Sequence, residues 1–141
     1  YENCEIIEAV DKDSGDALGY IYGYDGYIAD ICAKTECAGS GVGAALLGAF
    51  GKECADAGKK TVTLDVRRCN PAISSYQRGG FVDTETKFPG HYDWHGGYHM
   101  EAPAATLAAT LDKLSSFVTV NGWSESQGVQ KEDVPRRPAA V

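Results

Sequence analysis

A glycine-rich turn at the start of a predicted helix is the feature that most constrains the fold. Residues 38–47 read AGSGVGAALL, so glycines alternate with small residues and lead directly into an apolar stretch. Glycine allows backbone conformations and close approaches that other residues hinder. The first helical turn leaves its N–H groups unpaired, and the helix dipole adds partial positive charge there. Such a turn suits a phosphate or pyrophosphate group, and a flexible connector is the alternative interpretation.

The glycine turn and the segments around it do not match two common nucleotide-binding patterns. The spacing is GxGxG rather than the Rossmann spacing, and no Lys-Ser/Thr pair follows as in a P-loop. The preceding segments 4–10, 17–24 and 27–33 have strand patterns, and they are separated by the polar run DKDSGD and by Asp25-Gly26. Strands joined by such short turns form an antiparallel meander, which also argues against a Rossmann unit.

The middle of the chain alternates between helix and strand patterns. Leu46, Leu47, Phe50 and Cys54 recur at helical spacing and predict a helix over 44–57 that Gly58 ends. The β-branched run 61–66 predicts a buried strand. Residues 70–78 predict a short helix with an Asn-Pro start, and residues 81–88 and 98–102 predict two more strands.

This order of elements predicts an α/β (α+β) fold with a mixed, mostly antiparallel sheet. A β-α-β crossover makes its two strands parallel, so the central β-α-β-α-β unit contributes one parallel pair. We predict a core over residues 1–102 and a C-terminal extension over 103–141. In the extension, Pro103 opens a helix with Leu107, Leu111 and Leu114 on one face, FVTV-NG-W predicts a small hairpin, and KEDVPRRPAAV is typical of a solvated tail.

Composition excludes several classes of function. The net charge of -7 argues against nucleic acid as a partner and favours a cationic small molecule or peptide. No apolar run of about 18 residues predicts a membrane span. The five cysteines are odd in number and form no CxxC pair, which favours free thiols in a reducing, cytoplasmic compartment.

The stretch HYDWHGGYH raises the question of a metal site. His91, His95 and His99 are four residues apart, but Pro89-Gly90 and Gly96-Gly97 argue against the helix that would bring them onto one face. We therefore expect no metal. The aromatic residues of the stretch either line a channel for a substrate or pack in the last hairpin.

Together with the glycine turn, the segment NPAISSYQRGGF resembles the GNAT superfamily of N-acetyltransferases over about residues 3–102. In that family an Arg/Gln-x-x-Gly-x-Gly/Ala turn wraps the coenzyme A pyrophosphate, and an Asn-x-x-Ala-x-x-x-Tyr-x-x-x-Gly-Phe segment follows. Asn70, Ala72, Tyr76, Gly80 and Phe81 occur here in that order.

The resemblance implies roles for individual residues. The backbone amides of Ile31, Cys32 and Ala33 would hold the pantetheine arm and the acetyl carbonyl of acetyl-CoA. Asn70 would cap its helix, contact the pantetheine, or do both. The resemblance implies these positions for binding of acetyl-CoA: Ile31, Cys32, Ala33, Ala38, Gly39, Ser40, Gly41, Val42, Gly43, Asn70 and Ala72.

The catalytic groups follow from the same resemblance. Tyr76 would protonate the departing thiolate, since a phenol with a pKa of about 10 is still protonated at neutral pH; packing of an amphipathic core tyrosine is the alternative interpretation. Asp30 and Asp25 are candidates for the base, and each is also typical of a solvated or turn residue.

Two departures from the family pattern affect the functional prediction. Ala38 stands where the family usually has Arg or Gln, which predicts weaker coenzyme A binding by about 1–3 kcal/mol. Family members normally begin with a strand and one or two helices that wall the acceptor pocket, and about 50 residues of that kind are missing before Tyr1, so we expect either that the chain is trimmed or that another element replaces them. Segment 104–117 is a candidate replacement in cis or from a partner, and an exposed core would favour a homodimer.

Two functions follow as hypotheses. The first is an N-acetyltransferase that moves an acetyl group from acetyl-CoA to a primary amine of a small molecule or peptide. The second is a degenerate GNAT-like module without catalysis that serves as an interaction or assembly subunit.

Overall fold

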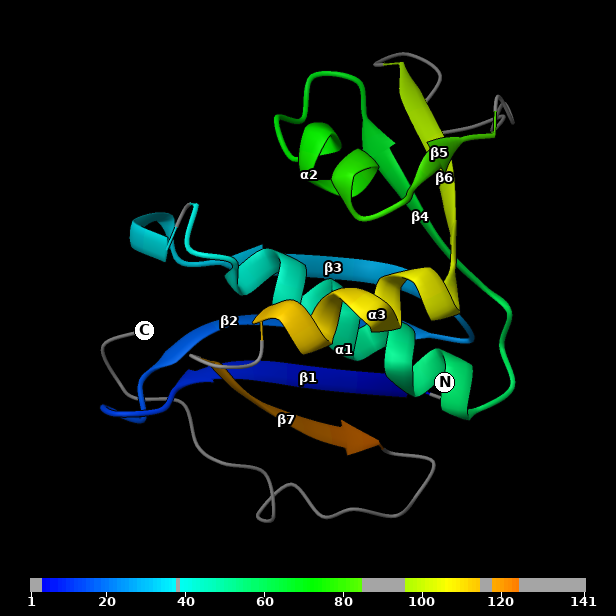
Figure 1. Cartoon of the computed structure of the whole chain (residues 1–141). Helices are drawn as coiled ribbons and strands as arrows, with labels where there is room; N and C mark the ends of the chain where they lie inside the picture. Colours follow the sequence, from blue (N-terminus) through cyan, green and yellow to red (C-terminus); the bar gives the residue numbers. More distant parts are fainter. Residues whose placement is uncertain (1–3, 38, 85–95, 115–117, 125–141) are drawn as a thin grey trace.

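The computed structural model describes residues 4–37, 39–84, 96–114 and 118–124. Within these residues seven strands form one sheet, and two α-helices, α1 and α3, lie side by side on one of its faces (Figure 1). The elements in chain order are β1 (Cys4–Asp11), β2 (Ala17–Tyr24), β3 (Tyr27–Ala33), the 3-10 turn η1 (Thr35–Cys37), α1 (Val42–Asp56), β4 (Thr61–Arg67), α2 (Ile73–Arg78), β5 (Val82–Asp83), β6 (Gly97–Pro103), α3 (Ala104–Leu114) and β7 (Val118–Ser124).

The sheet is mixed and mostly antiparallel, as the sequence predicts. Its strand order is β5-β6-β4-β3-β2-β1-β7, and β3 and β4 are its parallel pair. The tight β2–β3 hairpin forms because Asp25 and Gly26 both have positive φ, at 51° and 82°, which is the geometry of a type I′ turn. The α1 crossover then carries the chain to β4.

The parallel β3–β4 pair is short, so the two central strands separate over most of their length. β3 and β4 pair only at Tyr27 with Thr63 and at Ile28 with Leu64. In the rest of β3 the residues pair with β2 alone, and the β2–β3 register shifts between Ile28 and Asp30. A gap between the two central strands therefore opens beyond Leu64.

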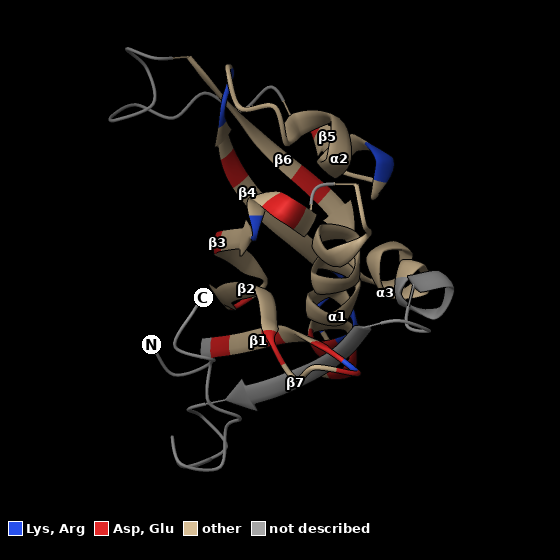
Figure 2. Cartoon of the chain, turned by 90° about the vertical axis from the view of Figure 1, so that its left-hand side faces the viewer, with Lys and Arg blue, Asp and Glu red and all other residues tan. Residues whose placement is uncertain are grey.

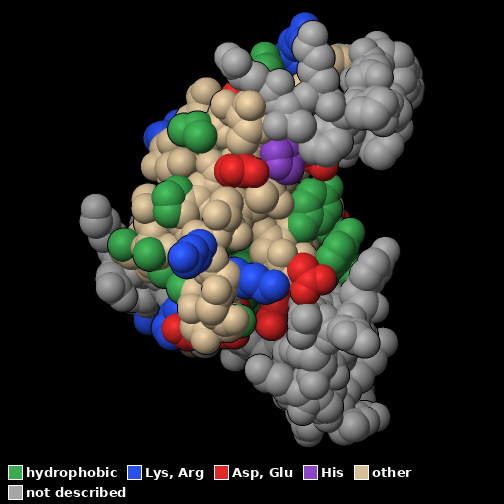
Figure 3. All heavy atoms as spheres, turned by 90° about the vertical axis from the view of Figure 1, so that its right-hand side faces the viewer, with side chains coloured by type: hydrophobic (Ala, Val, Ile, Leu, Met, Phe, Trp, Pro, Cys, Tyr) green, Lys and Arg blue, Asp and Glu red, His purple; other side chains and the backbone are tan. Residues whose placement is uncertain are grey.

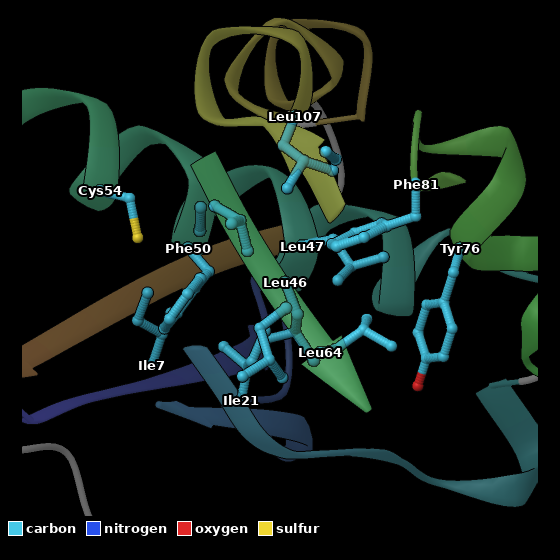
Figure 4. Close-up of a cluster of buried hydrophobic side chains, with 14 of the residues drawn as sticks. Ile7, Ile21, Leu46, Leu47, Phe50, Cys54, Leu64, Tyr76, Phe81 and Leu107 are labelled. Carbon is cyan, nitrogen blue, oxygen red and sulfur yellow. The ribbon is translucent and has the colours of Figure 1, made fainter. Parts of the chain in front are cut away.

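The core lies between the sheet and α1. Leu46 and Phe50 of α1 are fully buried against Ile7 and Ile21 of the sheet, as Figure 4 shows. Leu107 of α3 is also fully buried. It packs against Gly51 of α1, where a Cβ atom would lie 2.5 Å from the Leu107 Cβ. The glycine thus allows the two helices to approach closely.

The opposite face of the sheet carries a row of aromatic and polar side chains. Because side chains alternate along a strand and Ile21 points to α1, the tyrosines of β2 point to the other face. The rings of Tyr24 and Tyr27 lie 5.6 Å apart, and those of Tyr22 and Tyr24 lie 6.5 Å apart.

Residues 118–124 correct one prediction. They form a single strand, β7, and not a small hairpin at Asn121-Gly122. β7 pairs with β1 in one continuous antiparallel register, from Glu5 with Ser124 to Asp11 with Val118. The outer edge of β1 supplies backbone partners along the whole segment, and these outweigh the local turn preference of Asn-Gly.

The other elements match their predictions with shifted ends. α1 begins at Val42, two residues earlier than predicted, and the strand predicted over 81–88 is described only at Val82–Asp83. Residues 85–95, which hold His91 and His95, lie outside the described residues. Among the described cysteines, Cys32, Cys37, Cys54 and Cys69 are free thiols. None of the described helices is long and apolar enough to cross a membrane.

Candidate functional site

The glycine turn leads into α1, and the first amides of the helix find no partner among the described residues. Gly39 and Gly41 have φ of 78° and 93°, a left-handed conformation that favours glycine. The carbonyl of Gly41 accepts the first helical hydrogen bond from the Ala45 amide. Within the described part of the chain, no hydrogen bond engages the amides of Gly41, Val42, Gly43 or Ala44. Four N–H groups at the positive end of a helix dipole can bind an anion.

Neither the backbone conformation nor the packing requires a glycine at position 43. Its φ is not positive, and a Cβ built on it would meet no atom within 4 Å. Glycine disfavours a helix relative to alanine by about 0.5–1 kcal/mol, so the fold alone would favour alanine here. Gly43 lines a cavity, and the unused space at its Cα lies where a ligand would approach.

The cavity has a volume of about 590 Å³, which is within the usual range for small-molecule sites. It lies between the glycine turn, α2 and α3. Arg78, in the last turn of α2, brings positive charge to it, and its Nη2 donates to Ser75 Oγ at 2.9 Å. Figure 2 shows this basic turn of α2 from the side of the molecule. The lining residues are Ala33, Cys37, Gly39, Gly41, Gly43, Ala44, Leu47, Ser75, Arg78, Gly79, Leu107 and Thr110.

Only some of the predicted binding residues line this cavity. Ala33, Gly39, Gly41 and Gly43 do. The amide of Ser40 donates to the Cys37 carbonyl at 3.0 Å, so it is not available to a ligand. The other predicted positions that do not line the cavity are Ile31, Cys32, Val42, Asn70 and Ala72, and Ala38 lies outside the described residues.

Asn70 and Ala72 organise the start of α2. Asn70 Oδ1 accepts a hydrogen bond from the Ala72 amide at 2.8 Å, which holds the Asn-Pro turn one residue before the helix. One residue separates Asn70 from Ala72, whereas the family pattern has two. From Ala72 to Phe81 the spacing of the pattern is kept. The turn therefore differs while the face of α2 that bears Tyr76 is preserved.

Tyr76 points from α2 toward the gap between β3 and β4. The residue is 7% exposed, and its ring lies edge-on to Phe81 at 6.0 Å (Figure 4). No hydrogen bond within the described residues engages its hydroxyl. Burial, and to a lesser extent the charge of Asp30, raises the pKa of Tyr76 above its ordinary value. The phenol is therefore held in its protonated form and can donate a proton.

The two predicted carboxylates lie at different places. Asp30 is on β3, and its Oδ2 accepts a hydrogen bond from the Tyr20 hydroxyl at 2.5 Å. Its charge is the smaller of the two causes that raise the pKa of Tyr76. Asp25 lies in the β2–β3 turn, at the end of β3 away from the glycine turn.

Sequence reasoning missed the walls of the cavity that come from α2 and α3. Arg78, Ser75 and Thr110 are separated from the glycine turn by more than 30 residues and join it only through the packing of the helices. The predicted apolar stripe of the segment after Pro103 indicated a buried helix, but not which surface would cover it.

The model of the GNAT acetyltransferase domain matches residues 9–101, and the chain belongs to this family. Among solved structures, Ard1 from Thermoplasma volcanium is 30% identical, with a TM-score of 0.56 over 64% of this chain and 65% of that chain. The chain thus spans just under two thirds of that relative.

Two further solved structures share the fold. An acyl-CoA N-acyltransferase described as putative, from Klebsiella pneumoniae subsp. pneumoniae MGH 78578, is 21% identical, with a TM-score of 0.60 over 71% of this chain and 72% of that one. PaiA N-acetyltransferase from Thermoplasma acidophilum, solved with coenzyme A, is 22% identical, with a TM-score of 0.53 over 62% of this chain and 54% of that one. No curated protein matches the chain significantly.

Proposed function

We propose that this chain transfers the acetyl group of acetyl-CoA to a primary amine of a small molecule or peptide. The amides of Gly41 to Ala44, which no described residue engages, lie at the mouth of a cavity that also holds Arg78 and carry the proposal. A diphosphate needs several convergent donors and positive charge, and both are present there. The solved relative that contains coenzyme A supports a coenzyme A ligand for this fold.

The proposed path of the donor follows the cavity from the glycine turn to the gap between β3 and β4. Ala33 lines the cavity, and the β3 residues after Ile28 face the gap without pairing to β4. Backbone N–H groups along such an edge can hold the amides of the pantetheine arm and polarise the thioester carbonyl. Pairing that stops at Ile28 would place the acetyl group near Tyr76.

Tyr76 is the proposed general acid. As the C–S bond breaks, the phenol would give its proton to the coenzyme A thiolate. Its raised pKa suits this role, because the group stays protonated until the thiolate develops. Its hydroxyl makes no hydrogen bond to another described residue that would compete with the thiolate.

The test is a thiol-release assay with acetyl-CoA and a panel of primary amines, comparing wild type with Tyr76→Phe. Wild type is expected to release thiol, and the variant to lose most of kcat while it keeps its affinity for coenzyme A. Coenzyme A binding without turnover of any amine would instead support the interaction-module hypothesis. Failure of the wild-type chain to bind coenzyme A would refute the proposal.

A further inference from the structure

Four side chains, joined by two hydrogen bonds and one histidine–carboxylate contact, form a cluster on the sheet face opposite α1 and α3, away from the donor cavity. Tyr27 on β3 donates its hydroxyl to Asp65 Oδ2 on β4 at 3.1 Å. His99 on β6 places Nδ1 2.8 Å from Asp65 Oδ1 and Nε2 3.4 Å from Glu101 Oε1. The side chains of Asp65 and His99 are 13% and 16% exposed, and that of Glu101 is 43% exposed. The cluster thus runs from a mostly buried imidazole to a solvent-exposed carboxylate.

The cluster lies at the point where the central strands separate. Leu64 is the last residue of β4 that pairs with β3, and Asp65 follows it and pairs with His99 of β6. The side chain of Leu64 lies in the core on the same side as Tyr76 (Figure 4). Since side chains alternate along a strand, Asp65 emerges on the other face. Tyr76 and the cluster therefore border the same gap from opposite faces of the sheet.

We propose that His99, positioned by Asp65, removes the proton from the acceptor amine, an inference that rests on the proposed function. A carboxylate that accepts Nδ1–H leaves Nε2 as the ring nitrogen that can take a proton. Nε2 takes one proton from the incoming ammonium group, the resulting imidazolium pairs with Glu101, and Glu101 passes the proton on toward solvent. Asp65 and Tyr27 act through His99 as positioning residues.

The complete reaction also uses Tyr76, the proposed acid on the other face of the sheet. The deprotonated amine attacks the thioester carbon, a C–N bond forms, and the C–S bond breaks with its electron pair moving to sulfur. Tyr76 protonates the thiolate, and the second amine proton, carried by solvent, restores the phenol. The products are the acetylated amine, coenzyme A thiol and one proton released overall.

The surroundings of the cluster indicate a positively charged acceptor. Glu101 and Asp65 flank His99, and Asp30 lies on the same face of the neighbouring strand β3. Figure 3 shows a histidine and acidic side chains together at this end of the molecule. Val82 of β5, paired with Glu101, is 63% exposed and offers an apolar contact beside these charges. This chemistry favours an ammonium group carried on a partly apolar or basic molecule.

The experiment measures kcat and KM from pH 6 to 9 with acetyl-CoA and three probe amines: spermidine, tyramine and a short peptide with a free N-terminus. Wild type is compared with His99→Gln and Asp65→Asn. Asp56→Asn is the matched control, because it makes the same change at an exposed carboxylate of α1 that pairs with Lys52. Circular dichroism and a coenzyme A titration verify that each variant folds and binds the donor.

We expect His99→Gln to lower kcat by about 100-fold or more, to leave the affinity for coenzyme A unchanged, and to remove the rise of kcat with pH. Asp65→Asn should lower kcat less and change the pH profile, and Asp56→Asn should match wild type. Wild-type activity with an unchanged kcat and pH profile in His99→Gln would overturn the inference. If His99→Gln does not fold, a wild-type rate and profile in Asp65→Asn would overturn it instead. No acetyl transfer by wild type to any probe would refute the proposed function itself.

Discussion

Replacement of Gly43 by alanine separates the requirements of the fold from those of the ligand. Gly43 lies in the first turn of α1 with no positive φ, and a Cβ there would meet no protein atom within 4 Å. Alanine lowers the conformational entropy of the unfolded chain and favours the helix. We therefore expect Gly43→Ala to raise the free energy of unfolding by about 0.5–1 kcal/mol.

The same methyl group should weaken binding of the donor. In the proposed complex a phosphate group contacts the amides of Gly41 to Ala44, so the space beside Gly43 is occupied by ligand. Overpacking of a close contact costs about 1–3 kcal/mol, which predicts a loss of affinity for coenzyme A of roughly 5- to 150-fold. Urea unfolding measures the first effect, and calorimetric titration with coenzyme A measures the second.

Gly51→Ala is the matched control, since it makes the same change two turns further along α1. Its Cβ would lie 2.5 Å from the Leu107 Cβ and 3.0 Å from the Ala104 carbonyl oxygen, so we expect a destabilisation of about 1–3 kcal/mol. The reasoning is refuted if Gly43→Ala binds coenzyme A as wild type does, or if it destabilises the fold as Gly51→Ala does.

Three further predictions follow. Tyr76→Phe should lower kcat by about 100-fold or more with an unchanged dissociation constant for coenzyme A; a wild-type kcat in the thiol-release assay would exclude Tyr76 as the acid. Arg78→Ala should weaken coenzyme A binding and reduce its dependence on salt, because one charge-assisted contact is lost; equal salt dependence in both proteins would contradict a phosphate contact. Burial, with a smaller effect of the Glu53 charge, raises the pKa of Glu5 from 4.5 to about 7. The folded state therefore binds this proton more tightly, and its stabilising effect is full below about pH 4.5 and is lost as the pH rises through about 7. Relative to Glu5→Gln, the wild-type free energy of unfolding should fall over this interval, and parallel urea-unfolding profiles against pH would contradict it.

Local patterns in the sequence were sufficient for most of the fold. Hairpin signals such as Asp25-Gly26 and the helical spacing of Leu46 to Cys54 each depend on residues close in sequence, and the crossover rule then gives the parallel β3–β4 pair. β7 could not be predicted in this way. Its segment contains a good turn dipeptide, and only the unpaired edge of β1, more than 100 residues away in sequence, makes it a straight strand.

The candidate site was predictable where it depends on the main chain. The positive φ of Gly39 and Gly41 and the unpaired amides that follow are consequences of the glycine turn itself. Arg78 and Thr110 reach the cavity through helix packing, which no local pattern encodes. His99 was visible as one of three spaced histidines, but only the β4–β6 register places it against Asp65.

The central claim is that the amides of Gly41 to Ala44 hold the diphosphate of coenzyme A. The most direct measurement is a titration of the uniformly ¹⁵N-labelled chain with coenzyme A, followed by the amide resonances of these four residues. The account predicts large shifts and slowed hydrogen exchange at these amides at micromolar ligand, with little change at Lys59 and Lys60 at the other end of α1. Unperturbed resonances at Gly41 to Ala44 under saturating coenzyme A would contradict it.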